Sequence, residues 1–299
     1  MTDIIIIGGG PAGLTAALYA LRANKSVLVI EKATFGGQIT YSPKVENIPG
    51  FESVSGNEFA EKLVSQVLAQ GADVEMAEVT EIRGTDEKTV VADGKEYKAK
   101  AVIIACGARH RLLGAKGEQE LIGNGISFCA VCDGAFYKDK EVAVIGGGNS
   151  ALQEALLLSE LAKKVTVVQN LDYLTGEGKL QEQLAKKENV EVIFGSVVKE
   201  FIGTQEVEAI VIENAQGEQR LNVDGVFVAI GLVPQNEPFK DNIELNAYGY
   251  AEANESCVTR DKGIFVAGDC RSKKIRQVAT AAADGAVAAL AACDYIDGK

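Results

Sequence analysis

Near the start of the chain stands the segment Ile4-Ile5-Ile6-Ile7-Gly8-Gly9-Gly10-Pro11-Ala12-Gly13, followed by alanine- and leucine-rich residues up to Ala23. The β-branched run predicts a strand, the glycines predict a tight turn, and the alanine- and leucine-rich residues predict a helix. A second apolar run, Val27–Ile30, comes next at the spacing of a strand–helix–strand unit. The opening of the chain therefore predicts an α/β fold with a parallel sheet.

The glycines of this segment match the pattern G-x-G-x-x-G in the context that the pattern requires, between a strand and a helix. The first glycine allows the tight bend, the second lets a pyrophosphate approach the backbone, and the third lets the helix pack on the strand. The helix N-terminus favours the diphosphate, and an acid at the end of the second strand accepts hydrogen bonds from a ribose. We therefore predict a site for FAD or NAD formed by Gly8, Gly10, Pro11, Ala12, Gly13 and Glu31.

A second copy of the unit lies in the middle of the chain. It begins with the apolar run Val142–Ile145, continues through three glycines and a helical segment at 150–162, and ends with Val165–Val168. Each copy is followed by a later apolar run that enters a glycine, at 101–107 and at 225–231. This internal duplication predicts two similar α/β domains.

One more strand-like run, at 263–269, and an alanine-rich helix at about 280–295 come too late to belong to the second copy. We expect them to return to the first domain. The predicted fold class is α/β, with two Rossmann-like dinucleotide-binding domains of three-layer ββα architecture, the second inserted in the first. The first domain takes residues 1–113 and 241–299, and the central domain takes residues 114–240.

The second glycine motif, at 146–151, matches G-x-G-x-x-A, but the residues that would read a nicotinamide dinucleotide are missing. Gln169, which carries no charge, stands where the first copy has Glu31. An NADPH site also needs cations for the 2′-phosphate, and residues 169–175 contain no lysine or arginine. The sequence argues strongly against NADPH binding and weakens the case for NADH binding. It predicts that the central domain keeps its fold while its nucleotide pocket is unused or serves another purpose.

Two cysteines stand three residues apart in Cys129-Ala130-Val131-Cys132-Asp133-Gly134. Such a pair closes a small disulfide ring, in which one thiolate attacks and the other resolves. The chain offers one histidine and no second close cysteine pair, so a zinc site is not expected. We predict Cys129 and Cys132 as the redox-active pair, and the adjacent Asp133 as its proton donor and acceptor with a pKa raised by burial.

The remaining imidazole and thiols are expected to have structural roles. His110 lies between two arginines after a strand, where we expect a solvated basic loop. The other cysteines are isolated in the sequence and are expected to be small buried residues: Cys106, Cys257, Cys270 and Cys293.

The composition limits the classes of partner and the location. The chain has 299 residues, 47% hydrophobic and 24% charged, as in globular proteins of two domains. Its net charge of -12 argues against nucleic acid, because no excess of cations exists to neutralise phosphates. No apolar run approaches the roughly 18 residues of a membrane span, and no secretory signal precedes the first strand. We expect a water-soluble, cytoplasmic protein with no membrane, nucleic-acid or metal partner.

Taken together, the motifs resemble those of the low-molecular-weight thioredoxin reductases over nearly the whole chain. They are GGGPAG at 8–13, Gly36-Gly37-Gln38, Val45-Glu46-Asn47, CAVCDG at 129–134, GGGNSA at 146–151, and Gly268-Asp269 with Arg276-Gln277. The resemblance implies a homodimer that binds FAD in the first domain, carries the CxxC in the central domain and reduces thioredoxin. It implies further FAD contacts from Gly37, Gln38, Asn47, Val79, Ala105, Gly107, Gly268, Asp269, Arg276 and Gln277.

The chain departs from the NADPH-dependent members of that family. They carry a His-Arg-Arg run and a further arginine where this chain has Gln169-Asn170-Leu171 and Thr175, and Gln153 replaces an acid that is usual in the family helix. These differences resemble the ferredoxin-dependent flavin thioredoxin reductases. We therefore adopt reduced ferredoxin as the expected electron donor.

The resemblance also gives the two cysteines different roles. Cys132, with Asp133 beside it, would face the flavin, and Cys129 would attack thioredoxin. An acidic protein that meets an acidic ferredoxin needs a local basic patch, for which the candidates are Arg109, Arg111, Lys273, Lys274 and Arg276. Two alternatives stay open: an NAD(P)H-dependent disulfide reductase with an atypical nucleotide site, and a flavin redox sensor without turnover.

Overall fold

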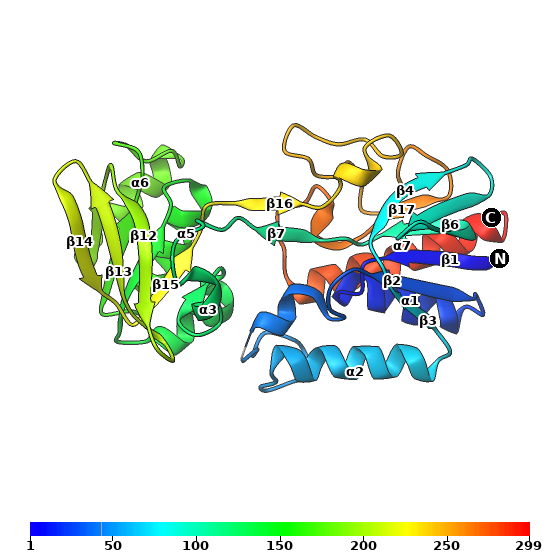
Figure 1. The fold of residues 1–299 in the computed structure, drawn as a ribbon, viewed down its shortest axis with the longest axis horizontal. Helices are drawn as coiled ribbons and strands as arrows, with labels where there is room; N and C mark the ends of the chain where they lie inside the picture. The colour runs from blue at the N-terminus through cyan, green and yellow to red at the C-terminus, as the bar shows by residue number, and fades with distance from the viewer. Residues whose placement is uncertain (43) are drawn as a thin grey trace. The chain divides into compact units, whose positions relative to one another are not determined.

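The structure, a computed structural model, describes residues 1–42 and 44–299 (Figure 1). It divides into two compact units, one made of both ends of the chain and one made of its middle: Met1–Arg109 with Val233–Lys299, and His110–Leu232. The sequence repeat predicts joints near residues 113 and 241, a few residues further along the chain. Both units contain a parallel sheet built on a strand–helix–strand unit, and the predicted α/β fold class is confirmed.

The first unit is built on a seven-stranded sheet of order β3-β2-β1-β6-β5-β4, in which β17 also pairs with β6. The pairs β1–β2, β2–β3, β1–β6 and β6–β17 are parallel, and the pairs β4–β5 and β5–β6 are antiparallel. The parallel part carries the carboxyl ends at which such folds bind nucleotides. The strands are β1 (Thr2–Ile7), β2 (Val27–Glu31), β3 (Asp73–Met76), β4 (Val79–Arg83), β5 (Lys88–Ala92), β6 (Lys95–Ile104) and β17 (Ile264–Val266).

Two alanine-rich helices of the first unit, α1 (Pro11–Arg22) and α7 (Val278–Ile296), pack side by side (Figure 1). Their buried faces share one core with β1, β2 and β6. A Cβ added at Gly285 would overlap the carbonyl oxygen of Ala12, so the close approach of the two helices depends on small residues. The third helix of this unit, α2 (Gly56–Ala69), begins at the side-chain cap of Ser55.

By length and composition alone, the 19-residue helix α7 is long and apolar enough to cross a membrane. The prediction that no segment of the chain meets this criterion is therefore wrong. Core helices of globular proteins meet it as well, and α7 has its alanines Ala281, Ala288, Ala289 and Ala292 buried in the core that it shares with α1. It also buries a charged side chain, Asp284, which is paired with two cations of its own unit.

The second unit repeats the strand–helix–strand unit of the first. Its five-stranded parallel sheet has the order β11-β10-β9-β15-β8, and a separate antiparallel sheet has the order β12-β13-β14. The strands are β8 (Ile126–Ser127), β9 (Glu141–Ile145), β10 (Lys164–Val168), β11 (Val190–Ile193), β12 (Val197–Gly203), β13 (Val207–Asn214), β14 (Gly217–Asn222) and β15 (Gly225–Val228). Its helices are α3 (Glu118–Leu121), α4 (Ala130–Asp133), α5 (Asn149–Ser159) and α6 (Gly178–Leu184).

Two short strands, β7 (Ala108–His110) and β16 (Leu232–Pro234), pair with each other where the chain leaves and re-enters the first unit. Short 3-10 helices fill other connections: η1 (Gly37–Tyr41), η2 (Gly134–Tyr137), η3 (Glu237–Phe239) and η4 (Gly268–Cys270). Two of these, η1 and η4, carry predicted FAD contacts.

Candidate active site

The first glycine motif has the strand–turn–helix geometry that the sequence predicts. β1 ends at Ile7, Gly8 turns the chain with φ +110°, and Pro11 begins α1 directly after Gly10. A Cβ added at Gly13 would overlap the carbonyl oxygen of Gly8. The third glycine of the motif is therefore required by the contact between helix and strand, as the pattern implies.

The acid predicted to read a ribose lies at this turn. Glu31 accepts a hydrogen bond from the Gly9 N–H to Oε2 at 2.7 Å and one from the Ala33 N–H to Oε1 at 2.9 Å. The two bonds fix the carboxylate beside the glycines. The structure thus brings together Glu31 and the motif at 8–13, at the carboxyl ends of β1 and β2.

The segment at 36–38 joins the same turn from outside the fingerprint. The Gly36 N–H donates to the Gly9 carbonyl at 2.7 Å, and a Cβ added at Gly37 would stand 3.4 Å from the Gly10 Cα. Both residues have positive φ, +104° and +63°, which favours glycine. The side-chain amide of Gln38 donates to the Ala108 carbonyl. Glycines from two segments therefore form one stretch of surface without side chains, which leaves room for a bulky nucleotide.

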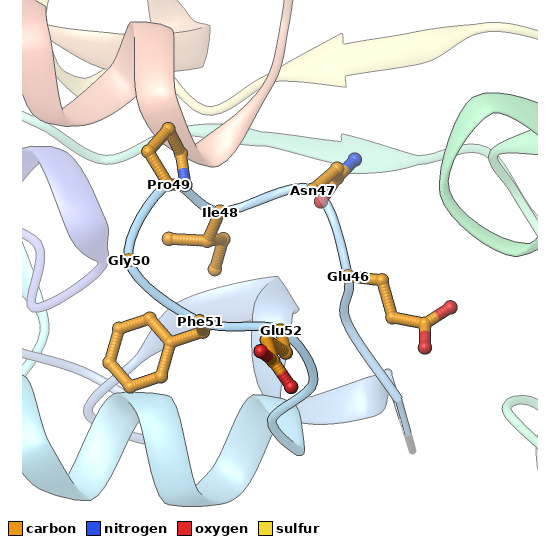
Figure 2. A pocket seen from close by; sticks show the side chains of 7 residues that line it. All are labelled: Glu46, Asn47, Ile48, Pro49, Gly50, Phe51 and Glu52. Carbon is orange, nitrogen blue, oxygen red and sulfur yellow. The ribbon is translucent and has the colours of Figure 1, made fainter.

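Two further predicted contacts meet although they stand far apart in the sequence. The Asn47 Nδ2 donates to the Gln277 Oε1 at 3.1 Å, across 230 residues of chain. Asn47 also lies in the loop 46–52, which lines a pocket (Figure 2). In that view the Asn47 side chain stands away from those of Ile48 and Phe51.

Asp269 gives the clearest sign that a ligand belongs in the first unit. It lies in η4 after Gly268, its Oδ1 is buried, and no residue in the described parts of the chain bonds to that oxygen. Burial raises the pKa of Asp269. A buried carboxylate oxygen without a partner is rare and calls for a donor, and FAD carries hydroxyl groups that are suitable donors. These residues fit FAD.

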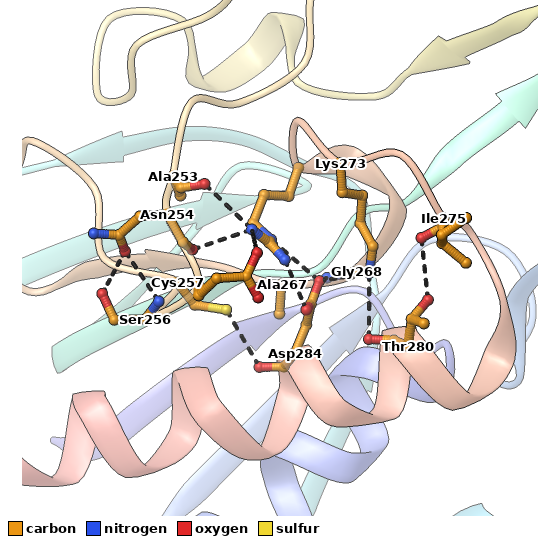
Figure 3. Close-up of polar contacts among 12 residues, drawn as sticks. Ala253, Asn254, Ser256, Cys257, Ala267, Gly268, Lys273, Ile275, Thr280 and Asp284 are labelled. Atoms are coloured by element: carbon orange, nitrogen blue, oxygen red, sulfur yellow. Dashed lines mark hydrogen bonds and ion pairs between the residues drawn. The ribbon is translucent and has the colours of Figure 1, made fainter.

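The segment that carries Asp269 is fixed by a buried charge network (Figure 3). Asp284 of α7 accepts hydrogen bonds from the Gly268 N–H at 3.0 Å, from Arg271 at 2.9 and 3.2 Å, and from Lys273 at 2.9 Å. The side chains of Arg271, Lys273 and Asp284 are only 4%, 9% and 11% exposed. Sequence reasoning missed Asp284, although an acid in the middle of an alanine-rich helix is a usable signal.

This network corrects one prediction. Lys273 was a candidate for a surface basic patch, but its ammonium is buried against Asp284 and the Thr280 carbonyl. Arg276 contacts the Tyr250 ring with its guanidinium 4.2 Å from the ring centroid, and its Nε donates to the Asp269 carbonyl at 3.4 Å. Arg276 therefore lies beside the predicted FAD contacts of its own unit.

The remaining predicted FAD contacts lie in and beside the same sheet. Ala105 donates its N–H to the Ile7 carbonyl, and its own carbonyl fills the space beside Gly8. Gly107 has φ +69° and open space beside it. Val79 is buried in the core of its sheet and pairs with Ala92 of β5.

The redox pair lies in the second unit, directly after β8. Cys129 and Cys132 form a disulfide with their Cα atoms 5.3 Å apart, and the Cys132 N–H donates to the Cys129 Sγ at 3.2 Å. Val131, between them, is 67% exposed. The disulfide thus projects an apolar side chain to solvent at its tip.

Asp133 adjoins the disulfide with the properties predicted for it. Its Oδ2 accepts a hydrogen bond from the Ser127 hydroxyl at 2.5 Å, and its Oδ1 is buried without a partner among the described residues. Burial raises the pKa of Asp133, and the Ser127 bond opposes that shift only in part. A carboxyl of this kind can hold a proton closer to neutral pH than an exposed aspartate does.

One minor prediction is wrong. His110 is not a solvated loop residue: its ring stacks on Phe128 at 4.5 Å between centroids, and burial lowers the pKa of His110 to about 4. The prediction that the other cysteines are small buried residues is confirmed for Cys257, Cys270 and Cys293, and Cys106 is half-buried. The Cys270 thiol is the main influence that raises the pKa of Cys106, ahead of burial. Both contacts join residues that are distant in the sequence, which sequence spacing does not reveal.

The second glycine motif has the turn of the first but not its ligand groups. Gly146 has φ +128°, and Gly148 precedes α5. Gln169, 3% exposed, donates from Nε2 to the Tyr173 carbonyl at 3.0 Å and accepts the Asn170 N–H at 3.1 Å. Its amide is therefore buried and bonded within its own loop, and it offers no charge to a nucleotide.

A Gly13→Ala variant is expected to be purified with at least about tenfold less FAD than the parent, because the new methyl group would overlap the Gly8 carbonyl oxygen. The ratio of flavin to protein absorbance measures this loss. Gly178→Ala in α6 is the matched control, since nothing lies within 4 Å of its Cβ position. Full flavin content in Gly13→Ala would contradict the prediction that the glycines at 8–13 form the FAD site.

Comparisons with known proteins show the family of the chain. The family model of the pyridine nucleotide-disulphide oxidoreductases matches residues 2–285. A protein of the rubredoxin operon of Clostridium pasteurianum is 45% identical, with 99% of this chain and 98% of the relative covered. The thioredoxin reductase of Bacillus subtilis is 43% identical, with 99% and 95% covered. The crystal structure of the Streptococcus pyogenes thioredoxin reductase matches with a TM-score of 0.96 at 40% identity, with 100% and 99% covered. The chain therefore belongs to the pyridine nucleotide-disulphide oxidoreductases and, within them, to the low-molecular-weight thioredoxin reductase family, whose members bind FAD.

Proposed function

We propose that this chain is a flavin-dependent thioredoxin reductase that takes its electrons from reduced ferredoxin. In this proposal the first unit holds FAD, and the second unit carries the Cys129/Cys132 pair that reduces thioredoxin. FAD supplies the conversion between single electrons and an electron pair. The chain supplies the disulfide that accepts the pair, and the acid beside it.

The choice of donor rests on one observation, the burial and hydrogen bonding of the uncharged Gln169 side chain. At the end of β2 the first unit has the charged carboxylate of Glu31 beside its glycine turn, whereas at the end of β10 the second unit has an uncharged, buried amide that is bonded to its own loop. The loop 169–177 offers no lysine or arginine to a 2′-phosphate. A donor that needs no nucleotide site is therefore favoured.

The energetics of this donor are favourable. Ferredoxin near about -400 mV and thioredoxin near about -270 mV leave roughly 6 kcal/mol for the transfer of two electrons, at about 1.4 kcal/mol per 30 mV. No driving force from a nicotinamide is needed.

The local geometry supports different roles for the two cysteines. The hydrogen bond from the Cys132 N–H to the Cys129 sulfur would stabilise a thiolate on Cys129 after reduction. The exposed Val131 beside it offers an apolar contact to a protein partner. We therefore propose that Cys129 attacks the thioredoxin disulfide and that Cys132 resolves the mixed disulfide. A homodimer and a cytoplasmic location remain part of the proposal.

An anaerobic titration of the purified holoenzyme tests the donor. Reduced ferredoxin is expected to bleach the flavin band within a catalytic turnover. NADPH or NADH at equal concentration is expected to bleach the band at least about 100-fold more slowly, because the nucleotide site lacks its charged contacts. Reduction of thioredoxin is followed in an insulin-coupled assay. Rapid bleaching by NADPH would favour a nicotinamide-dependent reductase instead, and failure with every donor and every thioredoxin would favour a redox sensor.

A further inference from the structure

A second buried acid, Glu154 of α5, lies beside the disulfide segment. The backbone N–H of Ala130, which follows Cys129, bonds to the Glu154 carboxylate. The other carboxylate oxygen, Oε2, is buried without a partner among the described residues. Helix α5 packs against α4, the short helix formed by the CxxC and Asp133. The proposed function uses Asp133 but gives no role to Glu154.

The charges around Glu154 favour its protonated form. Burial raises the pKa of Glu154 to about 8, the Ala130 N–H opposes this shift, and the charge of Asp133 adds to it. Asp133 is the charged side chain that acts on Glu154, and in the described structure no cation offsets it. Asp133 itself has a raised pKa and an oxygen without a partner. Two carboxyl groups, each with a free buried oxygen, therefore lie next to one disulfide.

The reaction needs two protons. Reduction of the Cys129–Cys132 bond breaks one S–S bond and forms two thiols, which consumes two electrons and two protons. A one-electron protein carrier delivers electrons without protons, so both protons must come from water through groups of the protein. Asp133 can hold one of them at a time. The site contains one further group of the right kind, at Glu154.

We propose that Glu154 is a second proton-holding residue of the dithiol site, positioned to resupply Asp133 while the disulfide is reduced. Glu154 contacts the Ala130 N–H rather than a sulfur atom, so it acts through Asp133 and is a positioning residue. The inference rests on the proposed function only in requiring that the electrons arrive without protons.

A purely structural role for Glu154 makes a different prediction. As an acceptor for the Ala130 N–H, the side chain could simply fix the first turn of α4. Glu154→Gln keeps an oxygen acceptor and the size of the side chain but loses the ability to release a proton. Glu154→Ala loses both. A structural role is therefore rescued by Gln, and a proton-holding role is not.

The test compares two reductants of the holoenzyme. Dithionite supplies electrons alone, and dithiothreitol supplies two electrons together with its two thiol protons. Thiols formed at Cys129 and Cys132 are trapped by alkylation and counted by mass. Glu154→Gln is expected to slow reduction by dithionite at pH 7 about tenfold, less than the roughly 10²–10⁴-fold of a direct general acid, and to leave reduction by dithiothreitol unchanged. Glu182→Gln, an exposed acid of α6, is the control.

The pH profile gives a second, independent result. Glu154 can give up a proton only while it is protonated, so the dithionite rate of the parent is expected to fall as pH rises through about 8. In Glu154→Gln this decline should disappear, and the infrared C=O band of a buried protonated carboxyl should be lost. Equal slowing with both reductants, or a parent-like pH profile, would overturn the proposal. Because dithionite replaces ferredoxin here, failure of ferredoxin as donor leaves this test intact.

Discussion

A Cys129→Ser variant is expected to reduce thioredoxin at least about 10³-fold more slowly than the parent, about 4 kcal/mol of transition-state free energy at 1.36 kcal/mol per tenfold. A hydroxyl cannot take part in the disulfide that accepts the electron pair, and no second disulfide is present among the described residues. Bleaching of the flavin by the donor should persist, since the predicted FAD contacts lie in the other unit. The two measurements are an insulin-coupled assay and anaerobic flavin absorbance.

Cys132→Ser should lose turnover to the same extent but fail at a different step. Cys129 can still attack thioredoxin, and without a resolving thiol the mixed disulfide should accumulate. Non-reducing gels and mass spectrometry detect this adduct, which Cys129→Ser should not form. Cys293→Ala, a buried thiol of α7, is the control and should keep nearly full activity. Accumulation of the adduct in Cys129→Ser instead would reverse the assigned roles.

The fold could be predicted because its deciding signals are local. Gly8, Gly13 and Glu31 lie within one strand–helix–strand unit, and the sterics of that turn leave few alternatives to glycine. The same holds for the disulfide, whose two cysteines stand three residues apart. A family resemblance then added the distant FAD contacts, of which Asn47 and Gln277 prove to be hydrogen-bonded.

What the sequence did not reveal depends on contacts between distant residues. Glu154 reads as one more polar residue of an amphipathic helix, but in the fold one of its carboxylate oxygens is buried and its helix packs against α4. Lys273 reads as a surface cation until Asp284 of α7 is placed against it. His110 reads as a solvated loop residue until Phe128 is placed against its ring. In each case the burial of a polar group is set by a neighbour that no spacing rule predicts.

An Asp284→Ala variant is expected to lose about 3–5 kcal/mol of stability, because it leaves the buried cations of Arg271 and Lys273 without a counter-charge. That loss is a large part of the roughly 5–15 kcal/mol that holds a typical protein folded. It should also free the Gly268 N–H and loosen the segment that carries Asp269, so FAD content should fall with it. Urea unfolding and the flavin-to-protein ratio measure the two effects.

The chain offers a matched control for this variant. Glu255 also lies against Arg271, at 3.9 Å, but its side chain is 99% exposed. Glu255→Ala should therefore change stability by no more than about 0.5 kcal/mol. Equal losses in the two variants would mean that the burial of Asp284 contributes nothing, and would remove the argument that α7 holds the segment that carries Asp269 through this carboxylate.

The same network predicts how stability depends on pH. Burial acts to raise the pKa of Asp284, but the hydrogen bonds from Arg271 and Lys273 outweigh it and hold that pKa below its usual value. A carboxyl whose pKa is lowered by folding stabilises the protein above the unfolded-state pKa of about 3.9, and that contribution is lost as pH falls through the folded-state value. The parent should lose stability below about pH 4 more steeply than Asp284→Ala, in which the contribution is absent at every pH. Parallel acid-unfolding curves for the two proteins would show that Asp284 is not ionised in the folded state, and the ion-pair network could then not be what fixes Asp269 in place.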